Sequence, residues 1–145
     1  MQRVLPIAVL MGLCLAAAPL RADDVTGAER LLCTSLEVMV ATEDGACEVD
    51  LPSNLNVPQF VEIDLKAGRL STTAASGENR ATTVDSVKRD NGLIILQGFE
   101  NGRAFSFMIS EQTGLLTVAV AREGLAVTAF GACTPLPAPP EPGRK

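Results

Sequence analysis

The side chains best suited to chemistry in this 145-residue chain are acidic residues gathered around one glycine. Glu43, Asp44, Glu48 and Asp50 flank Gly45. Carboxylate oxygens on a tight turn are ligands that calcium accepts, but the spacing does not match the loop of an EF-hand. Acidic residues beside glycine are also ordinary turn residues. The sequence therefore offers these four as a weak metal candidate, and it predicts no cofactor.

A second group, Asp85, Ser86 and Lys88, contains a hydroxyl and an amine. Alternation along a strand puts Ser86 and Lys88 on the same face, but no flanking glycines form a nucleophile elbow. A carboxylate pair such as Glu62 with Asp64 does acid–base chemistry only where it is partly buried. A carboxylate-based hydrolase is accordingly the last of three functional hypotheses, and no catalytic residue is assigned.

Three residue types are missing from the chain: it contains no histidine, tyrosine or tryptophan. Zinc sites that use histidine, Ser-His-Asp and Cys-His catalysis, and histidine proton shuttles are therefore excluded. The sequence thus favours a protein without enzymatic activity over an enzyme, and the carboxylate-based hydrolase stays the third hypothesis.

The first 22 residues have the organisation of a secretory signal peptide, with Arg3 before an apolar run from Val4 to Leu20, which Arg21 and Ala22 follow. Cleavage after Ala22 removes Arg3 and Arg21, which leaves ten Lys+Arg against seventeen Asp+Glu, a net charge of −7. The chain is predicted to be periplasmic or secreted and not membrane-spanning after cleavage. Its acidic, evenly mixed surface argues against nucleic acid as a partner.

Short strands between glycine turns are expected to position all of these residues. Asn91-Gly92 and Asn101-Gly102 are typical of type I′ hairpin turns, and turn signals recur about every 8 to 13 residues, as in all-β sandwiches and barrels. The prediction for residues 23–134 is one antiparallel meander of about eight short strands. It forms a small closed or half-open barrel, lipocalin-like in outline, with no long helix. Residues 23–30 are predicted to be a loose arm, and residues 81–89 a single strand.

Five prolines fall within residues 135–145, so this segment is predicted to be a proline-rich disordered tail.

Two-residue loops determine which side chains share a face. Around Asn101-Gly102, Gly98 faces Phe105, and Glu100 faces Arg103 as a charge pair. Further two-residue loops, at Thr113-Gly114 and Glu123-Gly124, extend the same inward face; the first would set Ile109 opposite Val118. The candidate lining of an apolar ligand cavity is Leu96, Gly98, Phe105, Phe107, Val118 and Val120. Gly98 either receives the Phe105 ring or leaves room for a ligand.

Three cysteines remain after cleavage, which in an exported chain indicates one disulfide and one leftover thiol. Barrel closure brings the last strand beside the first and favours Cys33–Cys133. A Cys33–Cys47 bond fits less well, because a hairpin turning at Asp44-Gly45 sets Cys47 across from Thr42. Cys47 is then free or intermolecular, and the protein is a monomer or a Cys47-linked dimer.

Several stretches resemble a family of small exported proteobacterial proteins of uncharacterised function. They are LIILQGFENGRAFSFMI (93–109), FGACTP (130–135), LNVPQF (55–60), and Cys33 with Asp44-Gly45-x-Cys47. The resemblance covers nearly the whole mature chain. It implies an exported β protein and no particular activity. Members of the family often carry a further cysteine where Val40, Ala41 and Thr42 stand here.

The leading hypothesis is a non-enzymatic periplasmic or secreted β-barrel binding or interaction protein that holds a small apolar ligand. The alternative is a packed structural or envelope-associated protein that acts through its surface or tail, with an envelope protein as its partner. That alternative predicts a filled interior and an exposed apolar patch on Ile95, Phe99, Met108 and Phe130.

Overall fold

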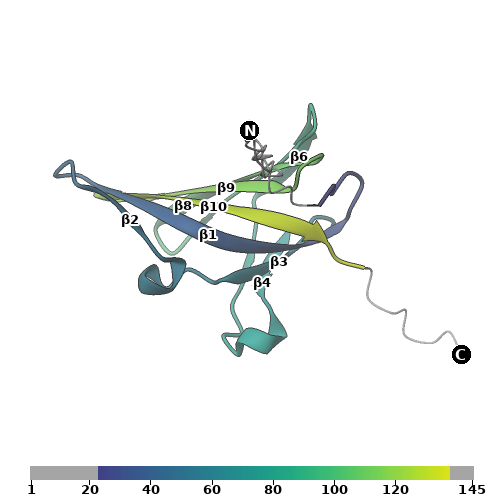
Figure 1. Ribbon diagram of the computed structural model, residues 1–145, viewed down its shortest axis with the longest axis horizontal. Coiled ribbons are helices and arrows are strands. Elements are labelled where there is room, and N and C mark those ends of the chain that lie inside the picture. The colour runs from purple at the N-terminus through teal and green to yellow at the C-terminus, as the bar shows by residue number, and fades with distance from the viewer. Residues whose placement is uncertain (1–22, 138–145) are drawn as a thin grey trace, which may run out of the picture.

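The structure is a computed structural model that describes residues 23–137. The predicted signal peptide, residues 1–22, and residues 138–145 of the predicted tail lie outside the described residues. The described residues form ten strands and two single-turn 3₁₀ helices, which confirms the all-β fold class (Figure 1). Among them, no helix is long and apolar enough to cross a membrane. The elements are β1 (Arg30–Thr42), β2 (Cys47–Asp50), η1 (Pro52–Leu55), β3 (Phe60–Asp64), β4 (Arg69–Thr72), η2 (Ala74–Ser76), β5 (Ala81–Thr83), β6 (Ser86–Asp90), β7 (Leu93–Glu100), β8 (Arg103–Ser110), β9 (Leu115–Arg122) and β10 (Leu125–Pro135).

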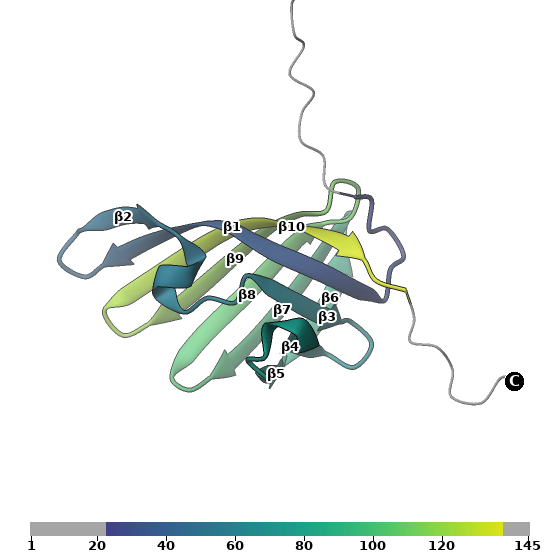
Figure 2. The same ribbon diagram turned by 60° about the horizontal axis from the view of Figure 1, so that its bottom comes forward.

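All ten strands belong to one antiparallel sheet, in the order β5-β4-β3-β1-β10-β9-β8-β7-β6, with β2 paired to β1 beside this path. The last strand, β10, pairs with the first along nearly its whole length, as barrel closure predicts. The sheet curls, so that β3 and β4 lie beneath the layer of β1, β10, β9 and β8 (Figures 1 and 2). The two edge strands, β5 and β6, are consecutive in the chain. The fold is thus a half-open barrel.

The two Asn-Gly hairpins form as the sequence predicts. Asn91 and Asn101 have φ of 49°, and the glycines after them have φ of 77° and 75°, as a type I′ turn requires. The register confirms that Gly98 faces Phe105 and that Glu100 faces Arg103. The loop at Glu123-Gly124 also has two residues. Asparagine and glycine tolerate positive φ, so these turns define the strands around them.

One predicted register is wrong by two residues. Ile109 pairs with Leu116 rather than with Val118, and Phe107 pairs with Val118. The loop is longer than expected because the N–H of Gly114 donates to the carbonyl of Ser110, at 2.8 Å, and closes a wider turn. A shift of two residues keeps every side chain on its predicted face.

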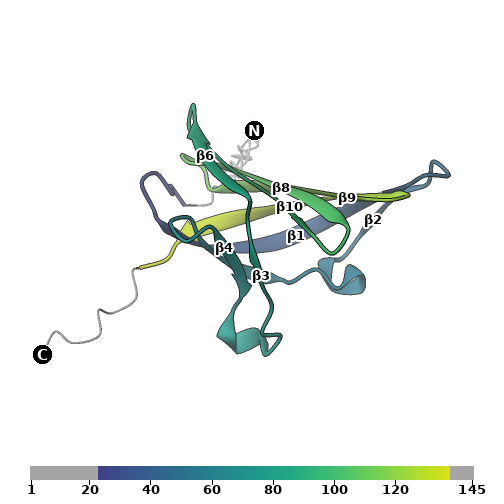
Figure 3. The ribbon, with the colours of Figure 1, turned by 180° about the vertical axis from the view of Figure 1, so that it is seen from behind.

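The single strand expected over residues 81–89 is split, which is one reason why there are ten strands and not about eight. Val84 donates its N–H to the carbonyl of Gly68 at 2.9 Å, whereas Asp85 donates to the carbonyl of Gln97 at 2.8 Å. Gly68 immediately precedes β4 and Gln97 lies in β7, near opposite edges of the sheet. The chain must therefore break its strand where it passes from one edge to the other (Figure 3).

The segment before β1 is not the loose arm that its polarity predicts. Val25 is fully buried, and its N–H donates to the carbonyl of Glu111 at 2.7 Å. Arg89 donates to the carbonyl of Ala28 and to the Glu111 carboxylate. The buried Val25 side chain and these hydrogen bonds together hold the arm against the β8–β9 loop.

The core fills the space between the curled halves of the sheet. Ile94, Leu96 and Ile109 from β7 and β8 are fully buried, and Ile63 from β3 is 1% exposed. The remaining buried apolar residues are Val25, Leu31, Cys33, Val38, Leu70, Leu116, Val118, Ala129 and Cys133. Burial of an aliphatic side chain of this size contributes about 1.5–3 kcal/mol, so this cluster holds the sheet in its curled form.

Candidate functional site

The predicted disulfide between Cys33 and Cys133 is present, with an S–S distance of 2.04 Å. The two cysteines face each other across β1 and β10, and each is 2% exposed. Cys47 is free and exposed. It faces Ala41 and not Thr42, because the turn carries one residue more than a two-residue loop would.

The acidic residues around Gly45 do not come together. Asp44 accepts hydrogen bonds from the Thr42 hydroxyl and the Ala46 N–H, which hold the pKa of its carboxyl below the usual value. Asp50 accepts from the Asn54 side chain at 2.6 Å. Within residues 23–137, no group of three or more His, Cys, Asp or Glu side chains could hold a metal ion. Asp44 and Asp50 instead hold the local turns through these hydrogen bonds.

The Ser86–Lys88 face lies on β6, an edge strand whose residues are all exposed. The Lys88 amine pairs with the Asp90 carboxylate at 2.8 Å. A salt bridge this exposed contributes little to the stability of the fold. Because the Lys88 amine is paired with Asp90, it does not act as a base for the Ser86 hydroxyl.

The six cavity candidates all lie on the inward face, where Leu96, Gly98 and Val118 are buried and the other three are half-buried. Leu96 is fully buried, and the ring of Phe105 lies over Gly98. A Cβ atom added at Gly98 would stand 2.4 Å from Cζ of that ring. The rings of Phe105 and Phe107 pack edge to face, with centroids 6.1 Å apart. Gly98 thus receives the aromatic ring, the first of its two predicted roles.

Replacing Gly98 by alanine is expected to lower the free energy of unfolding by about 1–3 kcal/mol, because the Phe105 ring must move aside. Replacing Phe105 by leucine as well should make the two losses less than additive, since the shorter side chain removes the clash. Urea denaturation of the two single variants and the double variant measures this coupling. Unchanged stability of Gly98→Ala would mean that space is open beside Gly98.

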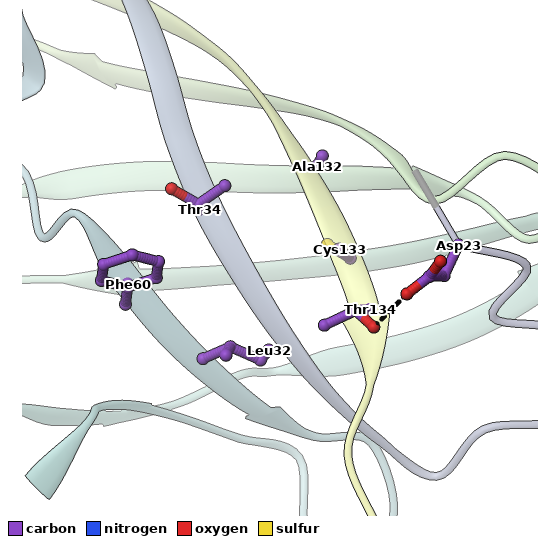
Figure 4. Close-up of a pocket in the computed structure, with 7 residues that line it drawn as sticks. All are labelled: Asp23, Leu32, Thr34, Phe60, Ala132, Cys133 and Thr134. Carbon is purple, nitrogen blue, oxygen red and sulfur yellow. Dashed lines mark hydrogen bonds between the residues drawn. The ribbon is translucent and has the colours of Figure 1, made fainter. Parts of the chain in front are cut away.

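An open hollow of about 310 Å³ lies on the outer side of the sheet, where β10, β1 and β3 adjoin. Leu32 and Phe60 give it an apolar floor, and Asp23 accepts a hydrogen bond from the Thr134 hydroxyl at its rim (Figure 4). A single carboxylate that already holds a hydroxyl lacks the second acid or base that hydrolysis needs. The hollow adjoins a much larger surface.

That surface is the outer side of the five adjacent strands β1, β10, β9, β8 and β7. Cross-strand pairs place fifteen outward side chains in three rows. The first row is Ala41, Ala126, Ala121, Ala104 and Phe99; the second is Met39, Thr128, Ala119, Ser106 and Gln97; the third is Glu37, Phe130, Thr117, Met108 and Ile95. We call these fifteen residues the five-strand face.

Only Glu37, at one end of the third row, is charged among the fifteen. The large side chains stand in solvent: Phe99 is 66% exposed, Met108 46% and Phe130 42%. An antiparallel sheet with one side on the core normally alternates apolar-in with polar-out, and about a quarter to a third of an ordinary surface is charged. On the five-strand face, by contrast, ten of the fifteen outward side chains are apolar and only one is charged.

Sequence alternation identifies Ile95, Phe99, Met108 and Phe130 as outward-facing, but it misses the alanine row. Ala104, Ala121 and Ala126 come from three strands and meet only through the register. Their shared property, an alanine at an outward position next to a turn, was a signal that could have indicated a row.

No protein-family model matches the chain, and neither the curated proteins nor the solved structures contain a match to it. The resemblance to a family of exported proteobacterial proteins stays a prediction. The geometry of the chain itself must therefore carry the functional argument.

Proposed function

We propose that this chain is an exported, non-enzymatic interaction protein that binds a protein partner through the five-strand face. The observation that carries the proposal is the single charge among fifteen outward side chains on five adjacent strands. Exposed apolar patches of this extent mark interaction sites, because their burial removes apolar surface from water.

The packing around Gly98 supports this function over a barrel that holds a small apolar ligand. Leu96 and Ile94 are fully buried, and the Phe105 ring occupies the space that Gly98 leaves free. The hollow beside Leu32 and Phe60 is a second place for an apolar group, and it is continuous with the five-strand face through Thr34 and Ala132. We assign it to the same interface, as a seat for one side chain of the partner.

Export is part of the proposal, and it follows from the signal-peptide pattern of residues 1–22. The mass of the protein recovered from the periplasm checks it. Cleavage after Ala22 and one internal disulfide give the mass of residues 23–145 less two hydrogens.

A photo-cross-linking amino acid at Met108 is expected to form one discrete adduct in cells that export the protein. Met108 lies in the third row of the five-strand face and is 46% exposed, so a partner docked on this face covers it. The matched control is the same amino acid at Ala81, an exposed residue of β5 at the far edge of the sheet. Equal labelling at the two positions, or none at Met108, would overturn the proposed function.

A further inference from the structure

We infer that the partner of the five-strand face is a second copy of this chain, packed face to face about a two-fold axis that runs across the strands. The inference rests on the proposed function, because it names the partner of the same surface. The order of large and small side chains, the distribution of charge and the area of the face favour a second copy.

On two of the five strands, large and small outward side chains alternate at a spacing of four residues. On β10, Ala126 lies in the first row and Phe130 in the third; on β8, Ala104 and Met108 do the same. A two-fold axis along the middle row exchanges the first and third rows. Phe130 of each copy then lies against Ala126 of the other, and Met108 against Ala104, whereas at the edge of the face Phe99 meets Ile95. The face is thus self-complementary on β10 and β8, as an isologous interface requires.

A two-fold axis parallel to the strands would leave each row facing itself. The row with Phe130 and Met108 would then meet the same row of the other copy, while the alanine rows would be held apart. The cross-strand axis is the one that lets the two sheets approach closely, and it is compatible with the angle of about −30° that twisted sheets adopt when they stack.

The lack of charge on the five-strand face disfavours a strongly charged partner but not a second copy of this chain. The described surface of the chain is acidic, so two copies repel wherever charged residues meet. The five-strand face offers them an approach without such contacts, since Glu37 lies at its margin and the rest is uncharged. A strongly charged partner would find no complementary group there.

The face is close to the smallest size that a specific dimer needs. The fifteen residues span five strands and three rows, or about 24 Å by 20 Å. A two-fold axis along the middle row brings these three rows onto the same three rows of the other copy. The footprint is thus about 480 Å² per copy, and the total of about 960 Å² is close to the roughly 1,000 Å² expected of a specific interface.

Ala119 provides the sharpest test, because it lies in the middle row and therefore faces Ala119 of the other copy. A cysteine at this position, in the full exported chain with Cys47→Ser, is expected to give a covalent dimer with a short bismaleimide. The matched control is Ala81→Cys in the same background, since Ala81 is exposed but lies off the face. Failure of Ala119→Cys to cross-link above the Ala81→Cys control would overturn the inference.

Sedimentation of the purified wild-type protein is expected to show a dimer, and Ala119→Lys is expected to raise the dissociation constant by about 100-fold, because two like charges then face each other. Circular dichroism confirms that the variant is folded. A monomeric wild-type protein would overturn the inference, and the cross-linking result does not depend on how Ala119→Lys folds.

Three outcomes identify another occupant. A dimer that needs Cys47 and not Ala119 has a different interface, because the two Cys47 residues would stand about 13 Å apart along the strands in the proposed arrangement. A monomer that dimerises only after residues 138–145 are deleted is covered by its own C-terminal segment. A Met108 adduct with a different protein overturns the second copy but keeps the proposed function, whereas no adduct overturns both.

Discussion

Replacing Cys33 and Cys133 together by alanine is expected to lower the free energy of unfolding by about 4.7 kcal/mol. The bond joins residues 100 positions apart, and the chain-entropy model assigns about that value to a closed loop of 100 residues. Domains of this size are stable by only about 5–15 kcal/mol, so this loss is a large part of the total. Guanidinium denaturation of the wild-type protein and the variant measures the difference.

Cys47→Ser is the matched control, because Cys47 is exposed and forms no disulfide. It should leave the denaturation midpoint unchanged. Reduction of the wild-type protein should lower its stability to nearly that of the double variant, since both remove the same link. A double variant with the midpoint of the wild-type protein would show that β1 and β10 restrict the chain without the bond.

The Cys33–Cys133 disulfide is a long-range feature that could be predicted from the sequence. Its pairing was predicted from barrel closure, which is a property of the whole meander. Asn91-Gly92 and Asn101-Gly102 determine their own geometry, so the registers around them were predicted residue by residue. The Thr113-Gly114 loop was predicted wrongly because a glycine at the end of a wider turn has the same local sequence as one in a two-residue loop.

Features that depend on distant contacts could not be predicted. The break at Val84–Asp85 arises because the chain is pulled toward β4 on one side and β7 on the other. The bulge between Ser35 and Glu37 has no glycine or proline of its own to indicate it. Alternation predicted four large residues of the five-strand face, but its first row consists mainly of alanines that only the complete register brings together.

Replacing Gly131 by alanine is expected to lower the free energy of unfolding by about 3 kcal/mol or more, because the new Cβ meets backbone. Gly131 is buried on β10 opposite Ser35, and a Cβ there would stand 1.9 Å from the carbonyl oxygen of Thr34. Gly131 does not have positive φ, so the effect is steric and not conformational. Strand β1 would have to separate from β10 beside the bulge, next to the disulfide.

Gly98→Ala is the comparison that isolates this mechanism. Its Cβ also meets atoms at short distance, but they belong to the far end of the Phe105 side chain, which can rotate away. Gly98→Ala should therefore be the milder variant and should be relieved by Phe105→Leu. Thr34→Ala cannot relieve Gly131→Ala, because the obstructing oxygen belongs to the main chain. Denaturation midpoints in the reverse order would show that β1 yields more easily than the Phe105 ring, and that the β1–β10 pairing is not the rigid centre of the sheet.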